Sequence, residues 1–305
     1  MKDEGALGAD EAVAVNGAEG AGPVDLGGVL AQHLTAWPGP ASAGVGGEGL
    51  PLATAGPAEE PFAWASVTKL LVSLALWVAV EEGTVTFEEP AGPPGSTVAH
   101  LLAHASGLPF EGAQPIAPPG RRRTYSNTGI ELAAAHLAEA AGMPFATYLE
   151  GAVLAPLGLE GTLLDGSPAH GAVGPLADLA ALAAELARPT LVSEATLYRA
   201  TQVAWPGLVG VLPGFGRQEP CDWGLGPEVR AAKSPHWTGA ENSPSTFGHF
   251  GQSGSLLWVD PQRSLYLVSV GATPFGPWAR RAWPAVADAV VRAAGERRPL
   301  SWWPA

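Results

Sequence analysis

The apolar run at 70–80 limits what this chain can fold into more than any other sequence feature. Its 11 residues contain no charged side chain. A helix needs about 20 residues to cross a membrane, so the run is too short to span one. We predict a buried helix that begins at Ser66 and extends to about Glu82, with Gly83 as its C-cap residue. The 305 residues of the chain are enough to form a core around such a helix.

Strand patterns lie at the two ends of the chain, with helical patterns between them. Short apolar runs broken by glycines predict two strands in 41–56. The runs at 255–259 and 265–270 flank Asp260-Pro261-Gln262-Arg263 and predict a β-hairpin. This order indicates a sheet made from both termini with a helical insertion. The helices that we predict span 25–37, 97–105, 128–141, 144–155, 175–187, 193–200 and 278–295.

The same patterns suggest a division of the chain. Residues 1–22 consist mostly of Gly, Ala and acidic residues without an apolar period, which predicts a disordered tail. We assign 23–85 and 201–300 to an α/β domain and 86–200 to an inserted helical domain.

Charge and composition exclude some classes of partner. The net charge is −13, and the one dense basic run is Arg121-Arg122-Arg123. Nucleic acids and anionic membranes are therefore not expected partners. The single cysteine, Cys221, forms no internal disulfide. The N-terminal segment has no apolar run typical of a signal peptide, so we expect a cytoplasmic protein.

Ser66 and Lys69 form the first candidate for catalysis. The chain has only three lysines against thirteen arginines, and Lys69 lies between apolar segments. Residues at i and i+3 share a helix face, so the hydroxyl and the amine can meet. Burial lowers the pKa of an amine, whereas arginine stays protonated. Taken alone, the pair also fits a helix N-cap beside a lysine whose amine extends to solvent.

Two later segments carry further polar groups. Tyr125-Ser126-Asn127 precedes a predicted helix, where Tyr125 can relay protons and Asn127 can orient the lysine. His249-Phe250-Gly251 leads into the hairpin, where Gly251 lets another backbone approach closely and the N–H of Gln252 can point at a substrate oxygen. His249 can bind a substrate carboxylate or assist proton transfer. Each segment alone also fits a structural role, as a helix cap, a packed ring or a structural histidine.

Together, Ser66-Val67-Thr68-Lys69, Tyr125-Ser126-Asn127 and His249-Phe250-Gly251 resemble the three signature elements of the serine β-lactamase and penicillin-recognising superfamily. The tyrosine form of the second element resembles the class C β-lactamase branch, which includes D-alanyl-D-alanine carboxypeptidases and family VIII esterases. The resemblance covers about 24–295.

This resemblance implies an α+β fold of the β-lactamase/transpeptidase type, with an antiparallel sheet built from both termini, flanking helices and an inserted all-α region. It implies Ser66 as the acylated nucleophile, Lys69 as its basic partner and Tyr125 as the proton shuttle. Asn127 would bind lysine and substrate, and the N–H groups of Ser66 and Gln252 would form the oxyanion hole. No cofactor or metal ion is implied.

Some residues depart from the family pattern or imitate other sites. His249 stands where β-lactamases of this branch usually carry lysine, so a permanent cation for a substrate carboxylate is missing. His236-Trp237-Thr238-Gly239 imitates the third element but is followed by a loop, so we prefer His249. His100 and His104 have zinc-like spacing without a third ligand, and we expect no metal there. Trp64 and Trp223 are candidates for the pocket wall, although core packing is favoured.

These features favour a serine hydrolase that acts through an acyl-enzyme on Ser66, as an esterase or amidase on a small acyl substrate. The expected partner is therefore a small-molecule ester or amide, while the oligomeric state stays open. A D-alanyl-D-alanine carboxypeptidase or β-lactamase is the alternative, followed by a non-catalytic ligand-binding relative. Segments around 110–120 and 205–245 are expected to shape the pocket.

Overall fold

The computed structural model describes residues 25–304 and is built on a six-stranded antiparallel sheet. Two strands come from the N-terminal part of the chain and four from the C-terminal part, so the predicted α+β fold with a sheet from both termini is confirmed. The strand order is β2-β1-β11-β10-β9-β8. These strands span Ala41–Gly47 (β1), Leu50–Ala55 (β2), Glu228–Val229 (β8), Phe247–Phe250 (β9), Leu256–Asp260 (β10) and Leu265–Gly271 (β11).

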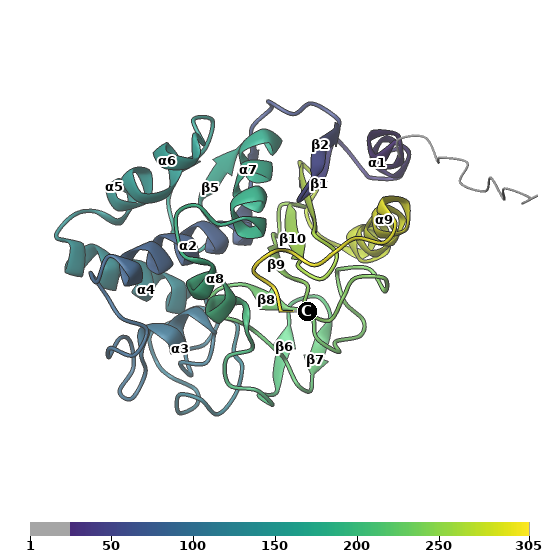
Figure 1. The fold of residues 1–305 in the computed structure, drawn as a ribbon. Coiled ribbons are helices and arrows are strands. Elements are labelled where there is room, and N and C mark those ends of the chain that lie inside the picture. The colour runs from purple at the N-terminus through teal and green to yellow at the C-terminus, as the bar shows by residue number, and fades with distance from the viewer. Residues whose placement is uncertain (1–24, 305) are drawn as a thin grey trace, which may run out of the picture.

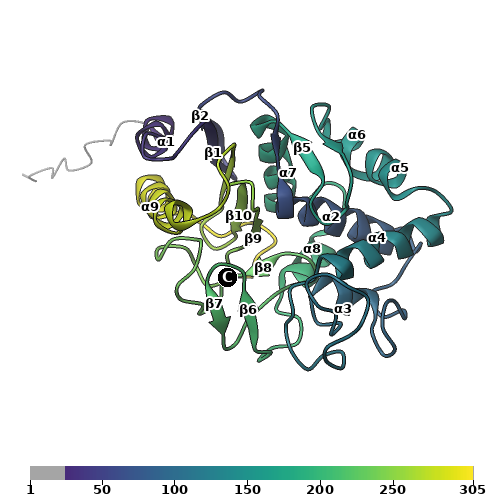
Figure 2. The same ribbon diagram turned by 180° about the vertical axis from the view of Figure 1, so that it is seen from behind.

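Alternate side chains of the sheet enter two different cores. Along β11, Leu265 and Leu267 pack with helices α1 (Leu26–Leu34) and α9 (Pro277–Ala294), while Val268 and its partners pack on the opposite face. Figure 1 shows α1 and α9 together on one side of the strands and α7 (Leu176–Ala187) on the other, and Figure 2 shows the same layers from behind. The alternation of side chains along these strands therefore creates two cores around one sheet.

The predicted apolar helix is confirmed as α2, which spans Thr68–Glu81 and is buried at every position from Thr68 to Ala79. A shorter 3₁₀ turn at Ala65–Val67 precedes it, so Ser66 lies just before the α-helix and not inside it. Gly83 follows the helix with a φ of 77°, as a residue after a helix end often requires. The other helices are α3 (Val98–Leu102), α4 (Asn127–Ala141), α5 (Phe145–Leu149), α6 (Ala155–Leu157) and α8 (Glu194–Thr201).

The helix predicted at 25–37 ends at Leu34, and turn residues follow it. Two other predicted helices differ from their expected form. The helix predicted at 97–105 ends at Leu102, because His104 adopts a φ of 54° and the carbonyl of Ala103 accepts a hydrogen bond from Arg123. The helix predicted at 144–155 contains a π-helical segment, Glu150–Leu154, between α5 and α6. The spacing of apolar residues reveals neither the early end of α3 nor the π-helical segment, because both are changes in the backbone conformation.

Short strands complete the fold around the helices. β3 (Phe62–Ala63) pairs with β5 (Ala172–Gly174), which also pairs with β4 (Leu163–Leu164). A separate hairpin joins β6 (Gly210–Leu212) to β7 (Gly216–Gln218).

The segment predicted as a helical insertion, 86–200, contains α3–α8 together with β4 and β5, and its α7 packs on the sheet. The domain boundaries that we drew stay a prediction. The disordered tail predicted for 1–22 lies outside the described residues. Within 25–304, no helix combines the length and the apolar character needed to cross a membrane.

The burial of α2 predicts where truncation of a side chain to alanine destabilises the fold. Leu74 is fully buried in the centre of α2, so Leu74→Ala should lower the free energy of unfolding by about 2–5 kcal/mol through lost burial and a cavity. Leu132 on α4 is exposed, and Leu132→Ala should change it by less than about 0.5 kcal/mol. Urea unfolding followed by circular dichroism measures both, and equal effects would contradict the central position of α2.

Candidate active site

Ser66 lies in a turn that is held from two sides. The N–H of Trp64 donates to the Ala172 carbonyl of β5, and the Ser255 hydroxyl donates to the Trp64 carbonyl over 2.6 Å. Ala65 adopts a φ of 44°, a left-handed conformation that is uncommon for alanine. These contacts fix the backbone immediately before Ser66, whose side chain is half-buried.

Lys69 brings its amine to Ser66. Lys69 Nζ lies 3.2 Å from Ser66 Oγ, as the spacing of three residues predicts. It also donates to Asn127 Oδ1 and to the Ala169 carbonyl, each over 2.8 Å. A neutral amine has two N–H groups and one lone pair. Since two acceptors bind the N–H groups, the lone pair remains for the Ser66 hydroxyl.

Burial lowers the pKa of Lys69 to about 7. The negative charge of Glu131 opposes this shift without cancelling it. Near neutral pH a large fraction of Lys69 is therefore unprotonated, and the amine can accept a proton from Ser66. The alternative in which Lys69 extends to solvent is wrong, because its side chain is completely buried.

Tyr125 and Asn127 reach the same place from the start of α4. The Ser126 hydroxyl caps this helix by accepting the Gly129 N–H over 3.0 Å, which fixes the residues on both sides of it. Lys69 Nζ lies 4.8 Å from the centre of the Tyr125 ring. Burial raises the pKa of the Tyr125 hydroxyl above its usual range, although a hydrogen bond with Ser66 opposes the shift. Tyr125 is therefore a neutral phenol that can donate a proton.

The protonation state of His249 follows from its two contacts. Nδ1 lies 2.7 Å from the Phe250 carbonyl, which can only accept, so Nδ1 carries the proton. Burial, and then the charge of Lys69, lower the pKa of His249 to about 3. The ring is neutral, and its unprotonated Nε2 accepts from the Tyr125 hydroxyl over 3.4 Å. A neutral imidazole lacks the charge with which it would bind a substrate carboxylate.

The turn after β9 packs against the backbone that precedes Ser66. A Cβ atom at Gly251 would lie 2.4 Å from the Trp64 carbonyl oxygen, so only glycine permits this approach. The neighbouring N–H of Gln252 and the N–H of Ser66 have no acceptor among residues 25–304. Two free donors thus belong to backbone segments in direct contact.

A cavity of about 160 Å³ opens beside Ser66. Phe110, Leu212 and Pro213 have no sequence signal of their own, although they fall in the segments expected to shape the pocket. Trp223, for which we favoured core packing, forms part of the wall, whereas Trp64 is fully buried. The residues that line the cavity are Ser66, Phe110, Tyr125, Leu212, Pro213, Trp223, Glu228, His249, Phe250 and Gln252.

Buried Arg123, two residues before Tyr125, joins three loops by hydrogen bonds. Its guanidinium donates to the carbonyls of Ala103, Ala204 and Cys221, which lie in three separate loops. The basic run in the sequence is therefore not a patch, because Arg123 is buried while Arg121 and Arg122 are exposed.

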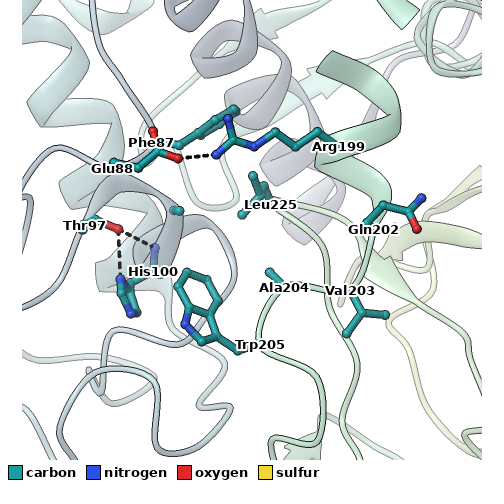
Figure 3. A pocket seen from close by; sticks show the side chains of 11 residues that line it. Phe87, Glu88, Thr97, His100, Arg199, Gln202, Val203, Ala204, Trp205 and Leu225 are labelled. Atoms are coloured by element: carbon teal, nitrogen blue, oxygen red, sulfur yellow. Dashed lines mark hydrogen bonds and ion pairs between the residues drawn. The ribbon is translucent and has the colours of Figure 1, made fainter. Parts of the chain in front are cut away.

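A second cavity, of about 400 Å³, lies between α3 and the end of α8 (Figure 3). His100 stacks on Trp205 at its edge, and Arg199 pairs with Glu88 across from them. His104 lies beside Tyr125 instead, with 4.6 Å between ring centres. The two histidines thus occupy different environments. The second cavity is also separate from the candidate catalytic residues, because its lining does not include Ser66, Lys69 or Tyr125.

Comparisons with known proteins identify the family of this chain. The sequence model of the beta-lactamase family matches residues 43–291. A beta-lactamase from Mycobacterium bovis is 52% identical, with 86% of this chain and 98% of that chain covered and a TM-score of 0.85. EstCE1, a hydrolase with promiscuous acyltransferase activity, shares the fold at 19% identity, with 88% of this chain and 97% of that chain covered and a TM-score of 0.70.

Among curated proteins, the D-alanyl-D-alanine-carboxypeptidase/endopeptidase AmpH of Escherichia coli K12 is 31% identical over 141 residues, or 34% of this chain. The matched region spans 37% of the length of that relative.

Fold, site and comparisons together define a serine hydrolase. The chain belongs to the beta-lactamase family, which confirms the resemblance inferred from the three motifs.

The desolvated amine predicts an unusual titration. Nuclear magnetic resonance of protein labelled with ¹³C and ¹⁵N on lysine should show the Lys69 side chain titrating with a midpoint near 7, well below the ordinary value of 10.5. Lys69→Met removes and thereby assigns the signal, which is practical in a chain with three lysines. A midpoint close to 10.5 would show that water reaches the amine.

Proposed function

We propose that the chain is an esterase or amidase that forms an acyl-enzyme on Ser66. The observation that carries this proposal is the contact of Lys69 with Ser66, Asn127 and Ala169, because it aims an amine lone pair at the hydroxyl. The low pKa of Lys69 makes that lone pair available at neutral pH.

In the proposed acylation, Ser66 Oγ attacks the carbonyl carbon of the substrate, and its proton passes to Lys69 Nζ. The oxyanion forms next to the N–H groups of Ser66 and Gln252, which are free to donate. The intermediate collapses as the alcohol or amine leaves with a proton relayed through the Tyr125 hydroxyl. Water then attacks the acyl-enzyme, which releases the acid and restores Ser66.

The cavity supports a small substrate. A volume of about 160 Å³ accommodates a short acyl group or a single ring. Its walls are mainly aromatic and aliphatic, which favours apolar substrates with few polar atoms. A cytoplasmic location is proposed alongside this activity, and cell fractionation tests it.

Acylation should occur at Ser66 and nowhere else. A fluorophosphonate probe should add one adduct by intact mass, and p-nitrophenyl acetate should be cleaved with a burst. Ser66→Ala should remove the adduct and lower kcat by at least about 10³-fold. Ser253→Ala is the matched control, because it removes a serine from the adjoining turn. Full esterase activity in Ser66→Ala would exclude the proposal.

A β-lactamase is the second candidate, and the similarity to the Mycobacterium bovis protein favours it. Because His249 is neutral, we expect nitrocefin to be cleaved at least about tenfold less efficiently than p-nitrophenyl acetate. Measurement of kcat/KM for both substrates on one preparation decides between the two candidates. Preference for nitrocefin would favour the β-lactamase.

A further inference from the structure

Glu228 is the charged residue that lines the Ser66 cavity in the described part of the chain. It belongs to the short edge strand β8 and lies opposite Gly248 of β9, next to His249. Its side chain is 2% exposed, so water screens its charge poorly. A carboxylate in such a wall influences every charged group that enters the cavity.

Three side chains from the following loop hold this carboxylate ionised. Lys233 Nζ and His236 Nε2 lie 2.9 and 2.8 Å from Oε1, and Trp237 Nε1 donates to Oε2. Burial alone would raise the pKa of Glu228, but these partners bring it down to about 2. The sequence His236-Trp237-Thr238-Gly239, which imitates the third motif, therefore supports the pocket wall from behind.

The balancing positive charges do not line the cavity. Lys233 is 1% exposed and also donates to the carbonyls of Asp222 and Val229. Arg123 is bound to loop carbonyls, and Lys69 is enclosed by its acceptors. His249 would bind a substrate carboxylate if it were protonated, but its ring is neutral. A substrate thus meets the negative end of a buried ion pair.

We propose that Glu228 determines substrate specificity by charge: it makes the cavity reject carboxylate-bearing substrates and accept uncharged esters or amides. This inference rests on the proposed function of Ser66. Like charges repel more strongly in a poorly solvated cavity than in water. Lys233 pairs with Glu228 without lining the cavity, so it offsets the repulsion only in part, and neutral His249 does not offset it.

Two esters with the same acetyl group test the proposal. 4-Acetoxybenzamide and 4-acetoxybenzoate differ in a carboxamide and a carboxylate of nearly equal size. We expect kcat/KM to be at least about tenfold higher for the benzamide. In Glu228→Gln this ratio should fall by about fivefold or more, because the repelling charge is gone.

Two further variants separate charge from folding. Glu228→Gln/Lys233→Met removes the whole ion pair and leaves no unpaired buried cation, and it should also reduce the ratio. Asp222→Asn changes a buried carboxylate in the loop before β8 that does not line the cavity, and it should keep the wild-type ratio. Equal cleavage of both esters by the wild type, or a ratio that neither Glu228 variant changes, would overturn the charge selection. Cleavage of neither ester would instead contradict the proposed esterase activity.

Discussion

The burial of one amine, that of Lys69, is the constraint on which the rest of the Ser66 site depends. Lys69 is inside because α2 is apolar on every side and passes through the middle of the molecule. Removal from water lowers the pKa of the amine, and the Asn127 side chain and Ala169 carbonyl orient it. The start of α4, which supplies Asn127, and the turn between β4 and β5, which supplies Ala169, therefore fix the position of the amine.

The same environment sets the states of the groups around the amine. Tyr125 stays a neutral phenol and His249 a neutral imidazole, because loss of water contact disfavours the charged form of each group. A site with so little free charge is suited to moving one proton among weakly solvated groups. It is less suited to binding a substrate by its charge, which agrees with the position of Glu228 in the wall.

The sequence predicts the local parts of this arrangement well. The sheet from both termini and α2 follow from apolar periodicity, and the contact of Ser66 with Lys69 follows from their spacing on a helix. The Ala169 acceptor is a backbone atom 100 residues further along the chain, and no side chain indicates it. Glu228 also has no local signal, because it lies in a two-residue strand and its partners come from a loop.

Arg123 constrains how the loops that it joins can change in evolution. Its guanidinium binds main-chain carbonyls of three loops, and these atoms are present whatever side chains the loops carry. The loops around Ala103, Ala204 and Cys221 can therefore exchange side chains while their backbones stay in register with one another. Side-chain substitutions in these loops leave the three hydrogen bonds intact, whereas an insertion that moves one of the carbonyls breaks its bond to Arg123.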